Sequence, residues 1–373
     1  MRPVDEAELA EAVRGANGPL RIVGGGTRGI GRLGVAEVLD VSGLSGITLY
    51  EPGALTLVAG AGTPVAEVEA VLAAERQRLA FEVPDLRRLL GRSGASTLGG
   101  VVAANASGPR RVQVGACRDA LLGVRFVDGA GVVVKNGGRV MKNVTGYDLV
   151  KLMAGSQGTL GVLTEVAFKV QAVPEAEATL VSGPVGAAAA VAAMAVALTS
   201  PFDVSGAAWD GRVLVRVEGM AGSVAYRAAE LAKRLPGFAA VTGADSAALW
   251  AGVRDVTAFA GGIGAVWRVA AKPSDAPAVL AALQDMPHRA VMDWGGGLIW
   301  LLVEGDGGAE VLRSAVTRLG GHATLIRGDL ECPVFHPEPG PVAALTAGLR
   351  ATFDPRGIFN PGMFGPGMFG KVA

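Results

Sequence analysis

The sequence predicts an α+β protein whose 373 residues fold in two parts. Short apolar runs of strand length alternate with longer amphipathic runs of helix length. Half of the residues are hydrophobic, so the chain can bury a large core. The texture changes at Pro174, where Glu and Ala begin to alternate. We therefore expect a first domain over residues 1–173, a second domain over residues 174–330, and a C-terminal segment over residues 331–373.

The first part predicts short strands with helices between them. We expect a helix over residues 5–15, strands over 20–23, 35–40, 47–51 and 55–59, a helix over 65–76 that Pro64 opens, a hairpin of 121–128 with 132–134, a short helix over 149–154 that Asp148 caps, and a strand over 161–170. Residues 80–115 are rich in Gly, Ser and Ala and show no clear period.

The second part predicts an α/β domain with an antiparallel sheet. We expect strands over residues 212–218, 266–270 and 298–303, and Ala-rich helices over 187–198, 223–235, 276–284 and 308–319. The uncharged stretch over 183–202 favours a buried helix over a membrane span. A helix over 341–352 precedes a tail that repeats Pro-Gly-Met-Phe-Gly and either docks on a partner or is disordered.

The charge balance and the cysteine count exclude several classes of function. Lys plus Arg equals Asp plus Glu, at 34 each, so nothing directs the chain to nucleic acid or to an anionic membrane. Two cysteines, Cys117 and Cys332, hold neither a disulfide scaffold nor an iron–sulfur cluster by themselves. The acidic N-terminus has no signal-peptide core, so a cytoplasmic location is expected.

The first of three glycine-rich segments follows the strand over residues 20–23. Gly24, Gly25 and Gly26 expose backbone N–H groups with no side chains in the way, and such a nest binds phosphate or pyrophosphate. Thr27 and Arg28 come next, and Arg28 adds positive charge. Taken alone, the segment fits an ordinary glycine turn equally well. It does not match G-x-G-x-x-G, which disfavours a Rossmann site.

The second segment spans residues 94–108 and combines small, hydroxyl and apolar residues. Ser96 and Thr97 can bond phosphate or ribose oxygens, and Asn105 can reach the heteroatoms of a ring. A flexible glycine loop is the alternative, but the apolar run over residues 101–104 indicates burial. The segment therefore fits a flat polar ligand.

The third segment places Gly155, Gly158 and Gly161 within seven residues, just before a strand. Backbone N–H and C=O groups at the start of that strand can read an adenine edge. The three segments occur in order in the first half of the chain, and that order is more specific than any one of them.

Seven motifs carry a resemblance to a known family. They are VGGGTR at 23–28, TLGG at 97–100, GPRR at 108–111, RD at 118–119, VMKNVTGYDL at 140–149, GSQGTLGVLT at 155–164 and FDPRGIFNP at 353–361. With them the chain resembles flavoproteins of the vanillyl-alcohol oxidase and p-cresol methylhydroxylase (PCMH) type, in particular the E-type FAD subunits of bacterial glycolate oxidase. The resemblance implies a two-subdomain PCMH-type FAD-binding domain, followed by an α/β cap domain with an antiparallel sheet.

The resemblance also implies which residues hold FAD. The first two segments would wrap the pyrophosphate, with Gly24, Gly25, Gly26, Thr27, Arg28, Ser96, Thr97, Leu98, Gly99 and Gly100. Pro84, Asn105 and Gly108 would lie on the flavin side. Gly155, Gly158, Leu160, Gly161 and Val162 would surround the ribose and adenine, and Asn360 would return toward the flavin with the C-terminal segment. Some members link FAD covalently through a His after the glycines or through a nearby Cys. Thr27 stands in the place of that His, so we expect noncovalent FAD.

The expected role is that of an FAD subunit in a glycolate oxidase complex of glyoxylate metabolism, which oxidises the substrate or relays electrons. The resemblance implies a sister FAD subunit that oxidises the 2-hydroxy acid and an iron–sulfur subunit that accepts electrons. A self-sufficient 2-hydroxy-acid dehydrogenase and a non-catalytic FAD-binding assembly subunit are the alternatives. Attachment to the inner membrane would go through the partners, since the chain itself predicts no span.

Candidate catalytic and polar residues are few. His288, His322 and His336 lie in unrelated contexts, so no metal site is expected, and His336 is a weak candidate for catalysis. Lys142, Asn143, Tyr147 and Asp148 form a polar cluster that lies beside the flavin or simply builds a turn and a helix cap; for Asp148 we favour the cap. Arg118 and Asp119 predict a local ion pair.

Overall fold

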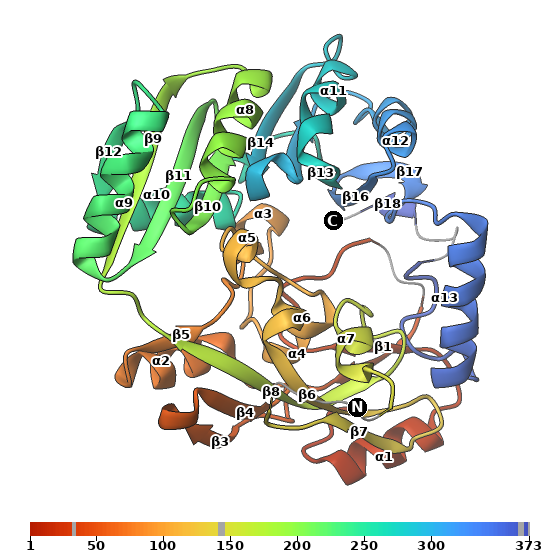
Figure 1. Cartoon of the computed structure of the whole chain (residues 1–373). Coiled ribbons are helices and arrows are strands. Elements are labelled where there is room, and N and C mark those ends of the chain that lie inside the picture. The colour runs from red at the N-terminus through yellow and green to blue at the C-terminus, as the bar shows by residue number, and fades with distance from the viewer. Residues whose placement is uncertain (32–34, 141–145, 365–368, 372–373) are drawn as a thin grey trace.

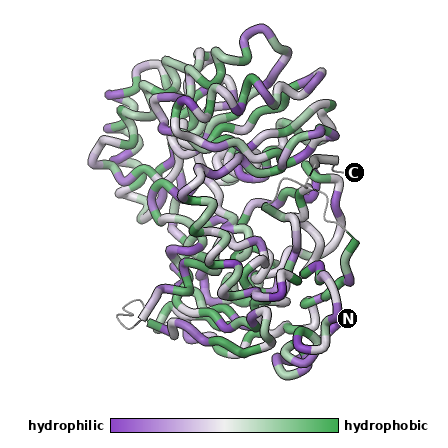
Figure 2. Tube along the Cα trace, turned by 90° about the vertical axis from the view of Figure 1, so that its right-hand side faces the viewer, coloured by the Kyte–Doolittle hydropathy of each residue, from purple (hydrophilic) through white to green (hydrophobic). Residues whose placement is uncertain are grey.

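The computed structural model describes residues 1–31, 35–140, 146–364 and 369–371 and arranges them in two halves, each built on a large sheet (Figure 1). The N-terminal half has a six-stranded sheet in the order β3-β4-β8-β6-β7, with β5 paired to β8. The second half has an eight-stranded sheet in the order β12-β9-β11-β10-β14-β15-β13-β16. Figure 2 shows the same halves from the side, one above the other. The predicted α+β class is confirmed.

The N-terminal half contains short elements. They are α1 (Glu6–Gly15), β1 (Leu20–Val23), β2 (Glu37–Asp40), β3 (Ile47–Glu51), the 3-10 turn η1 (Pro52–Ala54), β4 (Thr56–Gly60), α2 (Val65–Ala74), β5 (Gln77–Leu79), α3 (Arg87–Leu90), α4 (Leu98–Ala103), α5 (Arg111–Val114), α6 (Cys117–Ala120), β6 (Leu121–Val127), β7 (Val133–Gly137), α7 (Leu149–Met153) and β8 (Val162–Ala172). β1 and β2 form a separate parallel pair, so the end of β1 lies outside the main sheet.

The second half alternates strands and helices. They are β9 (Ala176–Pro184), α8 (Ala187–Leu198), β10 (Val204–Trp209), β11 (Arg212–Gly219), α9 (Ala221–Arg234), β12 (Ala239–Thr242), α10 (Gly243–Arg254), η2 (Thr257–Phe259), β13 (Ala265–Ala270), η3 (Pro273–Asp275), α11 (Ala276–Ala281), β14 (His288–Asp293), η4 (Trp294–Gly296), β15 (Leu298–Val303), α12 (Ala309–Arg318) and β16 (His322–Arg327). Every described pairing in this sheet is antiparallel, as expected.

The two faces of the eight-stranded sheet have different neighbours, because successive side chains on a strand point to opposite faces. Trp267 and Leu301 lie on the face that α8, α9, α11 and α12 cover, and both are buried. Val266 and Trp300 lie on the other face and pack with Leu89 of the N-terminal half. The second face is therefore the one turned toward the N-terminal half.

Buried ion pairs join the two halves. Arg216 on β11 bonds Glu82 of the N-terminal half at 2.9 Å, and Glu218 on the same strand bonds Arg110 at 3.1 Å and Arg78 at 2.7 Å. Arg216, Glu218 and Arg110 are almost inaccessible to solvent. Burial alone would raise the pKa of Glu218, but the guanidinium groups of Arg216, Arg110 and Arg78 outweigh it and hold that pKa far below its ordinary range.

The C-terminal segment runs back to the N-terminal half (Figure 1). It contains β17 (Asp329–Pro333), α13 (Gly340–Phe353) and β18 (Phe369–Lys371). After α13, Phe359 forms a parallel bridge with Leu20 of β1, and the Leu20 N–H donates to the Ile358 carbonyl at 2.7 Å. Ile358 and Phe359 pack in the core that α1 covers. The segment thus returns to β1 of the N-terminal half, while its predicted approach to the flavin stays a prediction.

Most elements expected from the sequence are present, including α1 with Asp5 at its N-cap and α7 with Asp148 at its N-cap. Two expectations were incomplete. Residues 80–115 contain α3, α4 and α5, which are too short for a helical period to show. Strands β9, β10, β12, β14 and β16 and helix α10 were not predicted; β10, for example, is mostly Gly, Ala and Ser, which have weak strand preference.

Three further expectations have different outcomes. The Ala-rich stretch in the second half forms α8, with Ala190 and Met194 buried against the sheet, and no helix in the described ranges is long and apolar enough to cross a membrane. Lys142, Asn143 and tail residues 365–368 lie outside the described residues. The predicted boundary after residue 173 falls between β8 and β9, which belong to different sheets; the division into domains remains our proposal.

Candidate functional site

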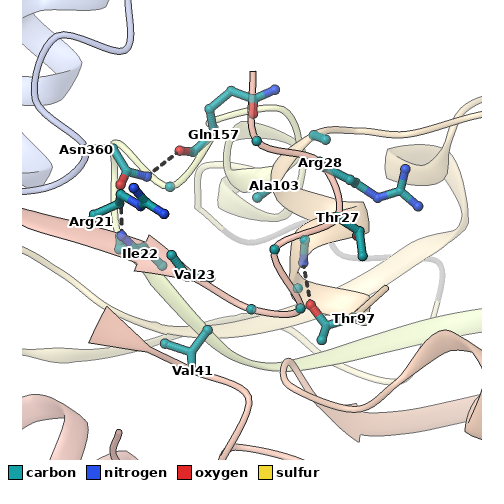
Figure 3. Close-up of a pocket in the computed structure, with 18 of the residues that line it drawn as sticks. Arg21, Ile22, Val23, Thr27, Arg28, Val41, Thr97, Ala103, Gln157 and Asn360 are labelled. Atoms are coloured by element: carbon teal, nitrogen blue, oxygen red, sulfur yellow. Dashed lines mark hydrogen bonds between the residues drawn. The ribbon is translucent and has the colours of Figure 1, made fainter. Parts of the chain in front are cut away.

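A cavity in the N-terminal half is lined by four segments that are far apart in sequence (Figure 3). The lining residues come from segments 21–31, 97–104 and 156–163 and from the C-terminal Asn360 with Met363, and Val41 and Arg92 add to the wall singly. The charged side chains among the described lining residues are Arg21, Arg28 and Arg92, with no carboxylate among them. The cavity therefore favours an anionic ligand.

The first wall is the loop that leaves β1. The backbone N–H groups of residues 24–29 donate to no other described residue, and all six residues line the cavity. Two glycines are needed for close approach: a Cβ on Gly24 would lie 2.4 Å from Thr97 Oγ1, and a Cβ on Gly25 would lie 1.5 Å from the Ala95 carbonyl oxygen. Gly26 has a φ of +68°, which favours glycine. The loop is thus an N–H nest pressed against the second segment.

The second wall is the start of α4. Thr97 is its N-cap, and the Thr97 hydroxyl accepts from the Gly100 N–H at 3.4 Å (Figure 3). The Gly99 backbone lies against Ala61, and a Cβ on Gly99 would lie 2.9 Å from the Ala61 Cβ. The small residues Gly24 and Gly99 therefore let α4 pack closely against both the loop after β1 and Ala61, which directly follows β4.

The third wall is the turn before β8, and α4 holds it in place. The Gly155 N–H donates to the Val102 carbonyl at 3.0 Å, and the Gln157 N–H donates to the Ala103 carbonyl at 2.9 Å. Ser156 lines the cavity, and its buried hydroxyl oxygen has no hydrogen-bond partner among the described residues. An unsatisfied buried hydroxyl at a cavity wall is what a polar ligand would complete.

Asn360 closes the cavity from the C-terminal side. Its Oδ1 accepts from the Ile22 N–H at 2.9 Å, and its Nδ2 donates to the Gln157 carbonyl at 2.8 Å (Figure 3). Its own N–H donates to the Leu20 carbonyl at 2.9 Å. Asn360 is 4% exposed and has a φ of +42°, a conformation that Asn tolerates better than most residues. One side chain thus joins β1 to the third glycine segment.

Arg28 gives the nest a fixed positive charge. Its Nη2 donates to Ser96 Oγ at 3.0 Å, while its buried Nε has no partner among the described residues. Burial lowers the pKa of Arg28 to about 10, against the opposing effect of Asp85, so the group stays charged at neutral pH. A cation beside free N–H groups is an arrangement for phosphate oxygens.

The structure brings eleven of the nineteen predicted cofactor residues into the cavity wall. These are Gly24, Gly25, Gly26, Thr27, Arg28, Thr97, Gly99, Gly100, Gly158, Gly161 and Asn360. The other eight are not in that wall: Pro84, Ser96, Leu98, Asn105, Gly108, Gly155, Leu160 and Val162. Leu98 and Val162 are wholly buried in apolar cores, and Ser96 bonds Arg28. Pro84 and Ser96 line a smaller hollow on the other side of Arg28.

Sequence reasoning missed several residues of the wall. They include Arg21, Ile22, Val23, Val41, Arg92, Ala103, Ala104, Ser156, Gln157, Leu163 and Met363. Ser156 and Gln157 belong to the motif at residues 155–164, which carries part of the family resemblance. The whole motif, and not only the residues picked from it, could therefore have been predicted to line the cavity. Arg92 and Val41 come from segments with no distinctive pattern, and only the folded chain brings them to the cavity.

The predicted catalytic candidate lies elsewhere. His336 is not in the cavity wall, and its ring nitrogens contact Thr317 Oγ1 at 3.0 Å and the Ala323 N–H at 3.4 Å. Among the described residues, no cluster of three or more His, Cys, Asp or Glu could hold a metal ion. The predicted pair of Arg118 and Asp119 is present at 3.8 Å on the surface.

The polar cluster after β7 is only partly described. Asp148 caps α7 by accepting from the Lys151 N–H at 3.1 Å, as favoured from the sequence. Tyr147 is 88% exposed. The structure thus gives a structural role to Asp148 and leaves Tyr147 on the surface.

Comparison with known proteins identifies the family. Residues 1–137, which include the nest and α4, match the model of the family described as "FAD binding domain". The chain is 37% identical over 350 residues to glycolate oxidase subunit GlcE of Escherichia coli (strain K12), covering 92% of each protein. The chain belongs to the GlcE family. It is an FAD-dependent oxidoreductase of the PCMH type, and its cofactor is FAD.

Other relatives of this GlcE-family chain match a shorter part. Glycolate oxidase subunit GlcD of Bacillus subtilis (strain 168) is 40% identical over 87 residues, which is 23% of this chain and 18% of that protein. A solved structure of alkyldihydroxyacetonephosphate synthase matches with a TM-score of 0.68 over 97% of this chain and 76% of that one, at 17% identity, and shows the shared fold alone.

The cavity of the GlcE-family chain fits the cofactor. FAD carries a pyrophosphate, and the nest offers free N–H groups beside Arg28. The Ser156 hydroxyl and the Arg28 Nε are buried polar atoms without a described partner. The close-packed glycines leave backbone, not side chains, at the ligand surface. These features are those that a dinucleotide requires.

Proposed function

We propose that the chain is the FAD-binding subunit of a complex that oxidises glycolate or another small 2-hydroxy acid. One observation carries the proposal: a cationic N–H nest closed by Asn360 lies in a chain that resembles GlcE over nearly its whole length. The named activity of that relative, glycolate oxidase, gives the substrate class.

Each wall of the cavity has a proposed task toward FAD. Residues 24–28 and 97–100 hold the pyrophosphate, and the free N–H groups of residues 24–28 together with the Arg28 guanidinium support this assignment. Residues 155–162 surround the ribose and adenine, while Asn360 fixes the position of that turn. Pro84, Asn105 and Gly108 lie on the flavin side, toward the second half, where Gly108 accepts from Trp294.

We further propose that FAD is held without a covalent bond. Thr27 follows the glycines, and its side chain is 5% exposed and has no nucleophile comparable to a His or Cys. Cys117 is wholly buried, and burial raises the pKa of its thiol, so it remains protonated and unreactive.

The roles that we assign to this chain and to its partner subunits follow from the residues that this chain contains. When bound, FAD would supply a two-electron acceptor, either for the carbinol carbon of the substrate or for electrons relayed from the sister subunit. The residues described here bind and orient the dinucleotide and keep its phosphates in a cationic site. Cys117 and Cys332 cannot hold an iron–sulfur cluster by themselves, so we assign electron acceptance to an iron–sulfur subunit and place a sister FAD subunit of the GlcD kind in the complex. Any membrane attachment would go through these partners.

Anaerobic addition of glycolate tests the proposal. The tagged chain is purified alone and, from its native host, with whatever binds it, and the flavin absorption is followed in both samples. We expect partners to co-purify and the flavin to be reduced by glycolate in the complex. Reduction of the isolated chain by glycolate or D-lactate would instead favour a self-sufficient dehydrogenase. Reduction by dithionite but never by substrate, even in the complex, would favour an assembly subunit.

A further inference from the structure

Trp294 is fixed at the junction of the two halves. It begins η4, directly after β14, and its indole Nε1 donates to the Gly108 carbonyl of the N-terminal half at 3.1 Å. Its backbone has a φ of +54°, which is strained for a bulky residue, and the Trp294 N–H donates to Asp293 Oδ1 at 2.7 Å. The structure therefore holds the indole in one orientation at the cost of local strain.

Two arginines from different halves share the ring of Trp294. The Cζ of Arg111 on α5 lies 4.3 Å from the ring centroid, and the Cζ of Arg268 on β13 lies 5.3 Å from it. Arg268 pairs in register with Trp300 and Thr324 on the sheet face that is turned toward the N-terminal half. Two positive charges are thus brought together between the halves.

Neither of these guanidinium groups has an ion pair or hydrogen bond to a described residue, although both residues are half-buried. A buried guanidinium group usually pairs with carboxylates, as Arg216 does with Glu82 and Glu218. Burial, and then the charge of Arg111, lowers the pKa of Arg268 to about 10, and both groups remain cations at neutral pH. Like charges held together without an anion are costly.

The carboxylate of Asp293 does not complete the pair. Its Oδ1 accepts the Trp294 N–H, and the residue is 3% exposed. Burial raises the pKa of Asp293 to about 8, so much of it is uncharged at neutral pH. An anion from outside the chain would supply the charge that the protein leaves out.

We propose that Arg111 and Arg268 bind the carboxylate of a small 2-hydroxy or 2-oxo acid between the two halves. Guanidinium groups match the two oxygens of a carboxylate, and the indole of Trp294 holds both groups at the junction of the two halves. The inference rests on the proposed function, which puts the flavin beside Gly108, the residue that Trp294 bonds.

Calorimetric titration of the FAD-loaded protein with oxalate and glyoxylate tests the site. We expect the wild type to bind, and Arg111→Gln and Arg268→Gln each to weaken binding by about 10-fold or more. Arg234→Gln is the matched control, because Arg234 also stacks on an aromatic ring, at 4.5 Å from the centroid of Phe202, away from the proposed site. Wild-type affinity in the two site variants, or no binding to the wild type, would overturn the inference.

Two further measurements separate this site from a structural role and from the proposed function. Without ligand, the Gln variants should melt no lower than the wild type, because they remove an unpaired charge; should either fail to fold, the Lys variants keep the charge, and we expect weaker oxalate binding because an ammonium group lacks the planar fork. Unchanged oxalate affinity in Arg111→Lys and Arg268→Lys would contradict the site. Reduction of the complex by glycolate, measured separately, decides the proposed function whatever oxalate shows.

Discussion

The side chain of Asn360 accepts a hydrogen bond from the Ile22 N–H, 338 positions earlier in the chain, at 2.9 Å. Ile22 belongs to β1, and β1 leads directly into the N–H nest. The same side chain donates to the Gln157 carbonyl in the third glycine segment. The C-terminal segment therefore fixes the relative position of two walls of the cavity that we propose for FAD.

Replacing Asn360 by Asp tests this link with almost no change of shape. Asp keeps the acceptor for Ile22 and the tolerance for positive φ, but it puts an oxygen against the Gln157 carbonyl. We expect a loss of about 1–3 kcal/mol in stability and an FAD affinity lower by about 10-fold or more. Denaturant unfolding and fluorescence titration of the apoprotein with FAD measure the two effects.

Asn136→Asp is the matched control for Asn360→Asp. Asn136 also donates from Nδ2 to a carbonyl, that of Tyr147 at 3.1 Å, and accepts at Oδ1 from the Leu149 N–H at 3.0 Å, but it does not line the cavity. This variant should lose stability and keep its FAD affinity. Equal FAD affinities in the two variants would argue against a cofactor role for Asn360.

A methyl group at Gly25 should disrupt the nest. The added Cβ would lie 1.5 Å from the Ala95 carbonyl oxygen, so the backbone must move. We expect Gly25→Ala to lose FAD during purification and to melt lower, as overpacked sites do. Gly18→Ala, whose Cβ meets nothing within 4 Å just before β1, should keep both FAD and the melting temperature. Full FAD content in Gly25→Ala would show that the loop has a different structure.

The buried ion cluster should be sensitive to the loss of one partner. Glu218→Gln leaves Arg216 and Arg110 buried without their shared carboxylate, which we expect to cost about 3–5 kcal/mol. Glu230→Gln, which breaks the surface pair with Lys233, should leave the melting temperature nearly unchanged. A small effect of Glu218→Gln would mean that the cluster is open to water.

The same cluster predicts loss of stability in acid. Burial would raise the pKa of Glu82, but Arg216 and Arg110 outweigh it, and the pKa of Glu218 is lowered in the same way. In the unfolded chain both groups take up protons below about pH 4.3, while the folded cluster resists protonation, so stability falls as the pH drops through that range. The melting temperature of Glu218→Gln should fall less steeply between pH 6 and pH 3.

The raised pKa of Asp293 predicts the opposite pH dependence of folding stability. Its pKa is raised to about 8 by burial in the folded chain and is about 3.9 in the unfolded chain, so its contribution to stability is lost as the pH rises between these values. Asp293→Asn keeps an acceptor for the Trp294 N–H and carries no charge. We expect this variant to gain stability over the wild type as the pH rises from about 5 to about 8, measured by denaturant unfolding. A constant difference across that range would contradict the raised pKa.

The sequence predicts the glycines of the cavity wall better than it predicts the side chains of that wall. Gly24, Gly25 and Gly26 were predicted because a glycine run after a strand has a direct backbone meaning. Asn360 was placed near the cofactor by resemblance alone, and its bonds to Ile22 and Gln157 depend on a long-range return that no local pattern shows. Arg111 and Arg268 could not be paired from the sequence, because only the packing of the two halves brings them to one indole.

The secondary structure likewise divides into elements that local sequence signals predict and elements that depend on their neighbours in the fold. Elements with strong local signals, such as α1 with its Asp5 cap, were predicted with nearly correct ends. Strand β10, rich in small residues, owes its conformation to its neighbours β11 and β14, so its own composition carried little information.

The flavin content of the purified chain, before and after denaturation, tests whether the chain binds FAD and whether it does so without a covalent bond. The protein is purified, its flavin is measured by absorption, and it is then denatured in acid and passed through a membrane that retains the chain. We expect one FAD per chain, all of it in the filtrate. A chain that purifies without flavin and binds none when FAD is added, or flavin that stays on the denatured chain, would contradict it.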